Sequence, residues 1–291
     1  MDLPLLIFLL LLITAAVFYL YWKRNYGKPD RLFPGVLAYH KIDGFELSGT
    51  WISPGRFAAH IDYLLDSGFI FIDEDTFVDA VEGRTEGSGR ELLLTFDDGY
   101  CDLLHQAAPI LKSRSIPALA FIVTSFAGRE NRWELNLPRR KSRHLDWEQL
   151  GELMSMGFDI GSHTATHRDL TRIPVEQARR ELQLSRVAIR ENLGIEAKSL
   201  SYPFGRAGPE IRREAEKAGY RVAFSLYPPF ANSRIDPFML RREGVYLIDS
   251  AFTVKCKLSR GNMFWMEDLK GRAINAVSVL TPIIKELGPG E

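Results

Sequence analysis

The sequence is poor in cysteine and has no excess of charge of either sign. Only two cysteines, Cys101 and Cys256, occur in 291 residues, too few for the disulfide framework of a small secreted domain. No CxxC spacing occurs either, so the usual sign of a structural zinc site is missing. Acidic and basic residues number 37 each. Because phosphate backbones are bound by concentrated basic surfaces, this balance argues against a nucleic-acid partner.

Charge is also missing from a stretch near the N-terminus. No charged side chain occurs from Leu3 to Trp22, and the stretch is dense in Leu, Ile, Val and Phe. A helix of about 20 residues spans the hydrocarbon core of a bilayer. A cleaved signal peptide is the alternative, but a basic leading region and a small-residue cleavage site are both missing. We therefore predict a transmembrane anchor over residues 1–22, a linker over residues 23–34 and one domain over residues 35–291.

The rest of the chain alternates between short apolar runs and amphipathic helical patterns. The apolar runs are typical of buried strands and cover Gly35–Tyr39, Phe69–Ile72, Leu92–Phe96, Ala118–Val123, Phe158–Gly161, Ser199–Tyr202 and Val222–Leu226. The helical patterns cover Pro54–Asp66, Leu103–Lys112, Trp147–Met156, Val175–Asn192 and Pro209–Ala218. This alternation predicts an α/β fold with a parallel sheet, either a distorted (β/α) barrel of about seven units or, as second choice, a doubly wound open sheet. In both architectures the chemistry lies at the C-terminal ends of the strands.

Two carboxylates follow the third of these runs. Asp97 and Asp98 come directly after Leu92–Phe96, and Gly99 permits a sharp turn that could bring both side chains to one site. Buried carboxylates are costly unless a cation or hydrogen-bond donors compensate them. A turn that only caps the next helix is the structural alternative.

Two histidines follow the run that begins at Phe158. His163 and His167 are four residues apart, a spacing that places both on one side of a helical turn, where they can share a metal ion. Together with Asp98 they would form a set of two histidines and one carboxylate with open positions, which suits a catalytic metal. Asp97 would then remain free to accept a proton.

Other polar residues occur at two further strand ends. His40 follows the first run and can donate a proton near neutral pH, although a single histidine at a strand end is more often structural. Ser201–Gly205 could form the wall of a sugar-binding groove or only a rigid turn. The remaining histidines lie in or beside helical patterns and are expected to have no catalytic role: His60, His105 and His144.

In order and placement these clusters resemble a known family. Thr95–Tyr100 (TFDDGY) followed by Ser162–His167 (SHTATH) resembles the first two motifs of the polysaccharide deacetylases of carbohydrate esterase family 4. The resemblance runs from about Val36 to Val245. It implies that Asp97 is the catalytic base, that Asp98, His163 and His167 bind a divalent metal ion, with zinc expected, and that the backbone N–H of Tyr100 lies near the developing oxyanion.

The sequence departs from many members of that family in one respect. Their general-acid histidine lies in a late motif, whereas no histidine follows His167 here. The early Tyr39–His40 pair instead resembles the branch that includes poly-β-1,6-N-acetylglucosamine deacetylases, in which the acid comes first. Leu240–Arg242 also resembles that branch. The resemblance therefore implies His40 as general acid and Arg242 as a residue near the base, with Tyr202 and Pro203 contacting or supporting the substrate.

The resulting hypothesis is a metal-dependent amide hydrolase that removes N-acetyl groups from an amino-sugar glycan and releases acetate. Two alternatives stay open: a deacylase or deformylase of a lipid-linked sugar, and a catalytically inactive glycan-binding module. The basic residues that follow Trp22 would place the domain in the cytoplasm by the positive-inside rule. The family resemblance points to an extracytoplasmic domain on a membrane anchor, and we adopt that expectation.

Overall fold

The computed structural model describes residues 33–44, 49–131, 142–228, 235–259 and 263–278, together with seven separate positions between Leu5 and Leu20. Its strands are β1 (Gly35–Tyr39), β2 (Lys41–Ile42), β3 (Trp51–Ile52), β4 (Ile70–Phe71), β5 (Glu91–Phe96), β6 (Ala118–Ile122), β7 (Phe158–Ser162), β8 (Ser199–Ser201), β9 (Val222–Leu226) and β10 (Leu240–Gly244). Its α-helices are α2 (Pro54–Asp66), α3 (Glu74–Val81), α4 (Ala108–Lys112), α5 (Trp147–Ser155), α6 (Val175–Leu193), α7 (Pro209–Lys217), α8 (Ala251–Ser259) and α9 (Phe264–Ser278).

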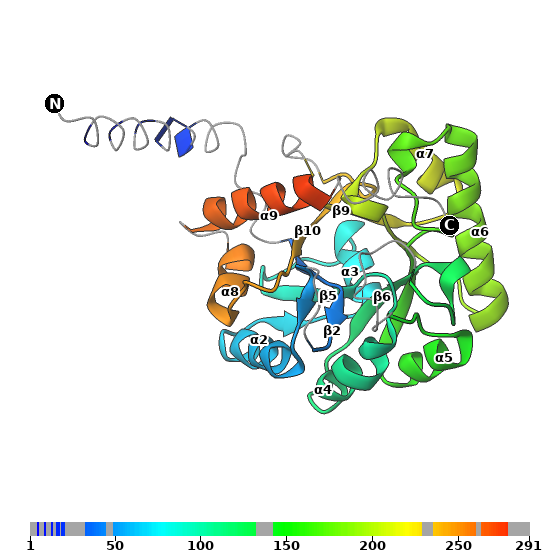
Figure 1. The fold of residues 1–291 in the computed structure, drawn as a ribbon, viewed down its shortest axis with the longest axis horizontal. Helices are drawn as coiled ribbons and strands as arrows, with labels where there is room; N and C mark the ends of the chain where they lie inside the picture. The colour runs from blue at the N-terminus through cyan, green and yellow to red at the C-terminus, as the bar shows by residue number, and fades with distance from the viewer. Residues whose placement is uncertain are drawn as a thin grey trace, which may run out of the picture.

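Seven parallel strands close into a barrel. The sheet runs in the order β1-β10-β9-β8-β7-β6-β5-β4, and β1 also pairs with β5, which joins the two sides of the sheet. Figure 1 shows helices α2, α4, α5, α6 and α7 arranged around this barrel. The predicted (β/α) barrel is therefore confirmed, and the open doubly wound sheet is excluded by the β1–β5 pairing.

The barrel is distorted at the start of its strands. β1 pairs with β5 from Leu92 to Phe96, so β4 and β6 must share the opposite edge of β5. β4 lies beside Glu91 and Leu92, whereas β6 lies beside Thr95 and Phe96. β4 therefore joins the sheet only at its N-terminal end, away from the C-terminal end where the predicted chemistry lies.

Two apolar clusters hold the layers together. The larger one lies between the barrel and its helices and includes Leu94, Phe96, Leu182 and Tyr202. The smaller one fills the barrel interior, with contributions from five strands and from α3: Val36, Ile72, Phe77, Val78, Leu93, Leu119, Phe121, Val222, Phe224 and Leu240. Because alternate residues of a strand face opposite sides, this inward set also fixes which polar residues face the interior.

Three local expectations differ from the structure. The pattern over Leu103–Lys112 predicts one α-helix, but a π-helical turn at Leu103–Ala107 precedes α4. The last strand, β10, was not expected from the sequence as a strand, although Leu240–Arg242 was noted as a motif. His163 and His167 do not lie on a helical turn, because irregular backbone separates β7 from the next 3-10 turn at Leu170–Arg172.

Most residues of the predicted anchor lie outside the described residues. Among the residues that are described, no helix has both the length and the apolar character needed to cross a membrane. The described positions in this segment include Leu5, Ile13 and Leu20, which are exposed. The anchor over residues 1–22 therefore stays a prediction.

Candidate active site

The polar side chains at the C-terminal end of the barrel come from alternation along the strands. Val36, Leu93 and Leu240 point into the barrel, so residues an even number of positions away along the same strands face the same way. This places His40, Thr95, Asp97 and Arg242 above the apolar interior. Ser201 joins them by accepting a hydrogen bond from Arg242, and His163 lies against the Ser201 carbonyl.

Asp97 forms a buried, two-point ion pair with Arg242. The Arg242 Nη1 and Nη2 atoms donate to Asp97 Oδ1 and Oδ2, each at 2.7 Å. Arg242 is fully buried and also donates to the hydroxyls of Thr95, at 3.1 Å, and Ser201, at 2.7 Å. Its guanidinium lies 5.3 Å from the centre of the Phe121 ring. The partner of Asp97, which the sequence left in doubt, is thus an arginine from the strand that completes the barrel.

The ion pair controls the charge of Asp97. Burial alone would raise the pKa of this carboxyl group, but the positive charge of Arg242 lowers the pKa well below its ordinary range. Asp97 is therefore ionised at neutral pH although it is only 2% exposed. A buried carboxylate of this kind can accept a proton only from a group held directly against it.

Asp98, His163 and His167 converge beside this pair. Asp98 Oδ1 lies 3.7 Å from His163 Nε2 and 3.5 Å from His167 Nε2. One potential ligand atom from each residue lies within 4.8 Å of those of the other two. A sharp backbone turn gives the Asp98 side chain this position, because Asp98 and Gly99 both have positive φ angles, 71° and 70°. A side chain at Gly99 would meet Ile122 Cδ1 at 2.6 Å, so the turn depends on glycine there.

The two histidines meet through bent backbone rather than helical spacing. Thr164 and His167 have φ angles of 68° and 59°, a region that non-glycine residues rarely occupy. Their rings are 4.8 Å apart between centres, at an interplanar angle of 68°. Strained backbone of this kind is typical of sites where geometry serves chemistry.

Both rings are in the form that binds metal. Burial lowers the pKa of His163 to about 4 and that of His167 well below its ordinary value, so both imidazoles are neutral at neutral pH. His163 Nδ1 lies 2.7 Å from the carbonyl oxygen of Ser201 and must donate to it, which leaves the lone pair on Nε2, facing Asp98. Two neutral imidazoles and one carboxylate suit a divalent transition metal such as zinc. The residues present therefore fit the metal that the family resemblance implies.

His40 lies at the rim of the same site. Its Nε2 atom is 4.0 Å from Asp97 Oδ2, and its side chain is 19% exposed, in contrast to the buried carboxylate. It follows β1 directly, where the alternation places it on the inner side. A group in this position can exchange protons with solvent and still reach a substrate bound over Asp97.

Tyr100 and its neighbours form a buried wall behind Asp98. The Tyr100 hydroxyl accepts a hydrogen bond from Asn131 Nδ2 at 2.8 Å, and its ring packs on His144 at 4.6 Å between centres. His144 Nδ1 in turn lies 2.8 Å from the backbone oxygen of Asp98. Burial lowers the pKa of His144 to about 4, so its neutral ring donates this bond. His144 therefore supports the turn that carries Asp98, a role that its sequence position did not indicate.

The Tyr202–Gly205 segment divides into a buried and a partly exposed part. Tyr202 and Pro203 are buried, and the Tyr202 hydroxyl donates to the carbonyl of Phe238 at 3.2 Å. Both residues therefore support the site rather than line it. Phe204 is partly exposed, has a φ of 58° and lies 5.1 Å from His167 between ring centres. It is the member of this segment placed to contact a bound sugar ring.

Two further residues lie within the motifs noted in the sequence, but neither of them was predicted to have a role of its own. Ser201 orients both functional groups, through its carbonyl to His163 and through its hydroxyl, which accepts from Arg242. Thr95 accepts from Arg242 and donates to the carbonyl of Leu37 at 2.8 Å. Their positions could have indicated these roles, because each is a hydroxyl residue near the C-terminal end of a predicted strand.

Comparison with known proteins agrees with this arrangement. Residues 84–223 match the family model described as polysaccharide deacetylase. The chain is 27% identical over 215 residues to YxkH of Bacillus subtilis strain 168, which is named as a putative polysaccharide deacetylase. The aligned region covers 74% of this chain and 71% of YxkH. It is 24% identical over 218 residues to the poly-β-1,6-N-acetyl-D-glucosamine N-deacetylase of Staphylococcus aureus strain MRSA252, covering 71% of each chain.

The fold has a matching solved structure. The structure of IcaB from Ammonifex degensii superposes with a TM-score of 0.68 at 25% identity, covering 78% of this chain and 97% of IcaB. Motifs, barrel topology and sequence similarity thus agree that this chain carries a polysaccharide deacetylase domain, matched over residues 84–223.

Proposed function

We propose that this protein hydrolyses N-acetyl groups on a polymer of N-acetylglucosamine and releases acetate, in a reaction that depends on a divalent metal ion. The observation that carries the proposal is the pair of adjacent carboxylates in two different environments. Asp97 is held by Arg242, whereas Asp98 faces His163 and His167. One carboxylate is thereby available for proton transfer and the other for metal binding. The similarity to a poly-β-1,6-N-acetyl-D-glucosamine N-deacetylase supports the choice of polymer.

The metal would be held by Asp98, His163 and His167, with zinc as the expected ion. When bound, such an ion acts as a Lewis acid toward a carbonyl oxygen and lowers the pKa of water. The neutral state of both imidazoles favours binding, because metal does not then have to displace protons.

The remaining steps belong to residues of the chain. Asp97 accepts a proton from the attacking water, and Arg242 positions its carboxylate without taking part itself. His40, 4.0 Å from Asp97 on the exposed side, donates a proton to the departing amine. Phe204 offers an aromatic surface to the sugar ring beside His167. Base and acid are separate groups, so neither has to change role within one turnover.

The test is acetate release from poly-β-1,6-N-acetylglucosamine by the purified full-length protein. We expect activity to be lost in the presence of a chelator and restored by added zinc. His163→Ala should bind no metal and release no acetate while remaining folded. His105→Ala is the matched control, because His105 is exposed and lies on the π-helical turn away from the site. Full metal content in His163→Ala would contradict the ligand assignment.

The same assay separates the alternatives. A lipid-linked N-acetylglucosamine offered in parallel identifies a lipid-directed deacylase if it is hydrolysed and the polymer is not. Release of formate instead of acetate identifies a deformylase. Polymer binding without any released acid, in protein that carries its metal, would show a glycan-binding module.

A further inference from the structure

Helix α9 carries its charges on its inner face and apolar residues on its outer face. The exposed positions that the structure describes along α9 and just before it are Met263, Met266, Leu269, Ala273 and Ala276. They recur every three or four residues, so they form one stripe. Every one of them is uncharged.

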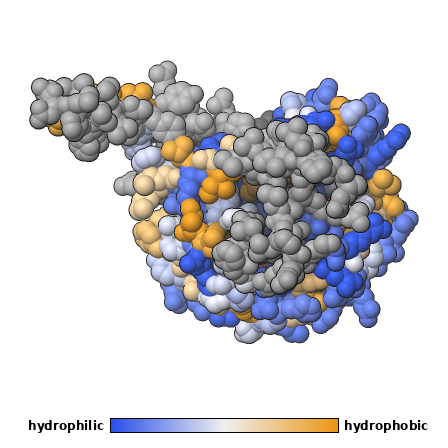
Figure 2. All heavy atoms as spheres, in the orientation of Figure 1, coloured by the Kyte–Doolittle hydropathy of each residue, from blue (hydrophilic) through white to orange (hydrophobic). Residues whose placement is uncertain are grey.

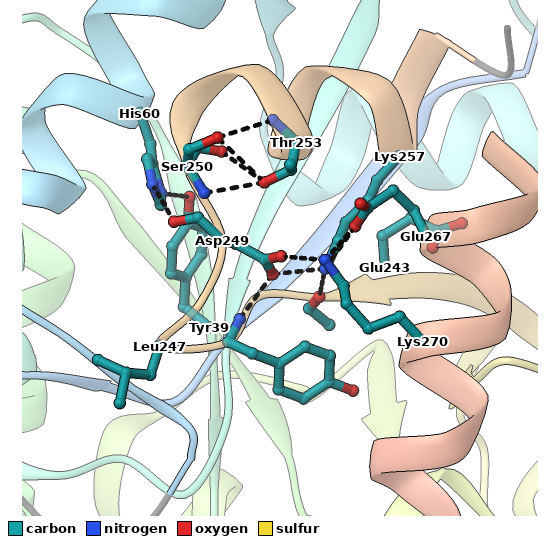
Figure 3. A network of polar contacts seen from close by, with 12 residues as sticks. Tyr39, His60, Glu243, Leu247, Asp249, Ser250, Thr253, Lys257, Glu267 and Lys270 are labelled. Atoms are coloured by element: carbon teal, nitrogen blue, oxygen red, sulfur yellow. Dashed lines mark hydrogen bonds and ion pairs between the residues drawn. The ribbon is translucent and has the colours of Figure 1, made fainter. Parts of the chain in front are cut away.

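The charged residues of the same helix point inward and are paired. Glu267 and Asp268 are 7% and 1% exposed. Asp268 accepts from Arg241 at 2.6 Å. Lys270 forms ion pairs with Glu267 and with Asp249, the latter at 2.6 Å. Figure 3 shows Lys257, Lys270, Glu267 and Asp249 converging between α8, α9 and the barrel. The helix is thus firmly bonded to the domain through its charges.

This arrangement reverses that of a helix that faces water, whose outer face is charged. The apolar surface extends to the neighbouring segment, where Ile248 is 66% and Phe252 51% exposed. Outside the N-terminal segment, nine large apolar side chains are exposed in the described part of the chain, and five of them lie between Ile248 and Leu269. Figure 2 shows apolar residues gathered over this side of the molecule. Such a concentration marks a surface that is covered in use.

The N-terminal segment indicates what covers this surface. The Tyr19 ring lies 6.0 Å from the Trp265 ring between centres, in an edge-on arrangement. This contact places Tyr19, a residue of the uncharged Leu3–Trp22 stretch, beside α9. Tyrosine and tryptophan are the residues that collect at the boundary between lipid and water. We propose that the face formed by Ile248, Phe252, Met263, Met266 and Leu269 docks on the surface of a phospholipid bilayer.

Docking would fix the orientation of the catalytic barrel. α9 is bonded through Asp268 to Arg241, which precedes Arg242 on β10. The inference does not rest on the reaction proposed above, and its test uses no activity measurement, so either can fail without the other.

The experiment uses the full-length protein in vesicles of phosphatidylcholine and phosphatidylglycerol whose acyl chains carry bromine, which quenches nearby tryptophan. The signal of Trp265 is the emission that disappears in Trp265→Phe. We expect this emission to be quenched in brominated vesicles compared with unbrominated ones. In the double variant Met266→Glu, Leu269→Glu the quenching of Trp265 should be lost, while far-ultraviolet circular dichroism stays unchanged.

Leu184→Glu is the matched control, since Leu184 is 60% exposed on α6, on the side of the barrel away from α9 (Figure 1). It should leave the quenching unchanged. Unquenched Trp265 in the wild-type protein would overturn the proposal, as would equal quenching in the double variant. Chemical cross-linking of two copies that disappears in the double variant, with Trp265 unquenched throughout, would instead identify an interface between two copies of this chain.

Discussion

At the scale of single residues, the environment of each carboxylate decides its role. Asp97 and Asp98 are adjacent and equally buried, yet the first faces an arginine and the second faces two neutral histidines. The sequence predicted both groups from spacing and strand ends. It could not predict how Ser201 connects them, because that depends on one carbonyl and one hydroxyl brought close by β8.

His40 is expected to act only when the amine departs. His40→Asn should therefore bind metal normally and lower turnover by about 10²–10⁴-fold, the range for a lost general acid, with little change in KM. The alkaline limb of the pH profile should also disappear, because that limb reports deprotonation of the acid. Steady-state kinetics across pH check both points. Turnover near the wild-type level would return His40 to a structural role.

Arg242 is expected to keep Asp97 ionised over the acid side of the same profile. Asp97 works as a base only when ionised, so activity falls as the pH drops through its pKa, which Arg242 holds low. Arg242→Lys keeps the charge but loses the two-point contact. The pKa of Asp97 should then rise and the acid limb should move to higher pH, with kcat/KM lower by roughly 10–100-fold for the lost charged hydrogen bonds.

Arg241→Lys is the control for this substitution, because Arg241 lies on the same strand and bonds to Glu243 and Asp268 outside the barrel. The acid limb of the pH profile of Arg241→Lys should match that of the wild-type protein. An unmoved limb in Arg242→Lys would show that the ion pair does not govern the base.

At the scale of helices and strands, hydrophobic pattern predicted most of the barrel but not the strand that closes it. β10 reads Leu-Arg-Arg-Glu-Gly, and three charges in five residues are untypical of a buried strand. The charges are tolerated because both faces of the strand find partners: Arg241 pairs with Glu243 and Asp268 outside, and Arg242 pairs with Asp97 inside. Arg242 and Asp97 are 145 positions apart, so no local pattern could indicate this compensation.

The start of α3 makes the stability of the barrel depend on pH. Glu74 is 5% exposed, and its backbone N–H donates to Asp159 at 3.0 Å. Burial raises the pKa of Glu74 from 4.5 to about 7. A carboxyl group with a raised pKa in the folded state stabilises the fold fully below pH 4.5, and this contribution is lost as the pH rises through about 7.

Glu74→Gln should therefore raise the free energy of unfolding at pH 8 by about 2–3 kcal/mol and change it little at pH 4. Urea unfolding at the two pH values measures the difference. The control is Glu86→Gln, which removes an exposed carboxylate and should have the same small effect at both. A gain that is equal at pH 4 and pH 8 would show that ionisation of Glu74 is not its cause.

At the scale of the whole molecule, the uncharged N-terminal stretch predicts how the barrel is attached to a membrane. We expect Leu3–Trp22 to remain on the mature protein and the barrel to be extracytoplasmic. N-terminal sequencing of protein from the membrane fraction should begin at residue 1 or 2, and a C-terminal tag should be digested by protease added outside intact cells. A mature chain that begins after Trp22 would identify a signal peptide.

The position of β1 has a consequence for how the protein is made. β1 pairs with β5 on one side and with β10 on the other. The ring therefore cannot be completed until β10, which is synthesised long after β1, is available to pair with it. Pairings that join distant parts of a chain form slowly, and domains fold as they emerge during synthesis. Until β10 arrives, Asp97 has no guanidinium beside it, and an ionised carboxylate resists burial. Formation of the Asp97–Arg242 ion pair and closure of the barrel are therefore one event, and a nascent chain that has not yet reached Leu240 holds neither.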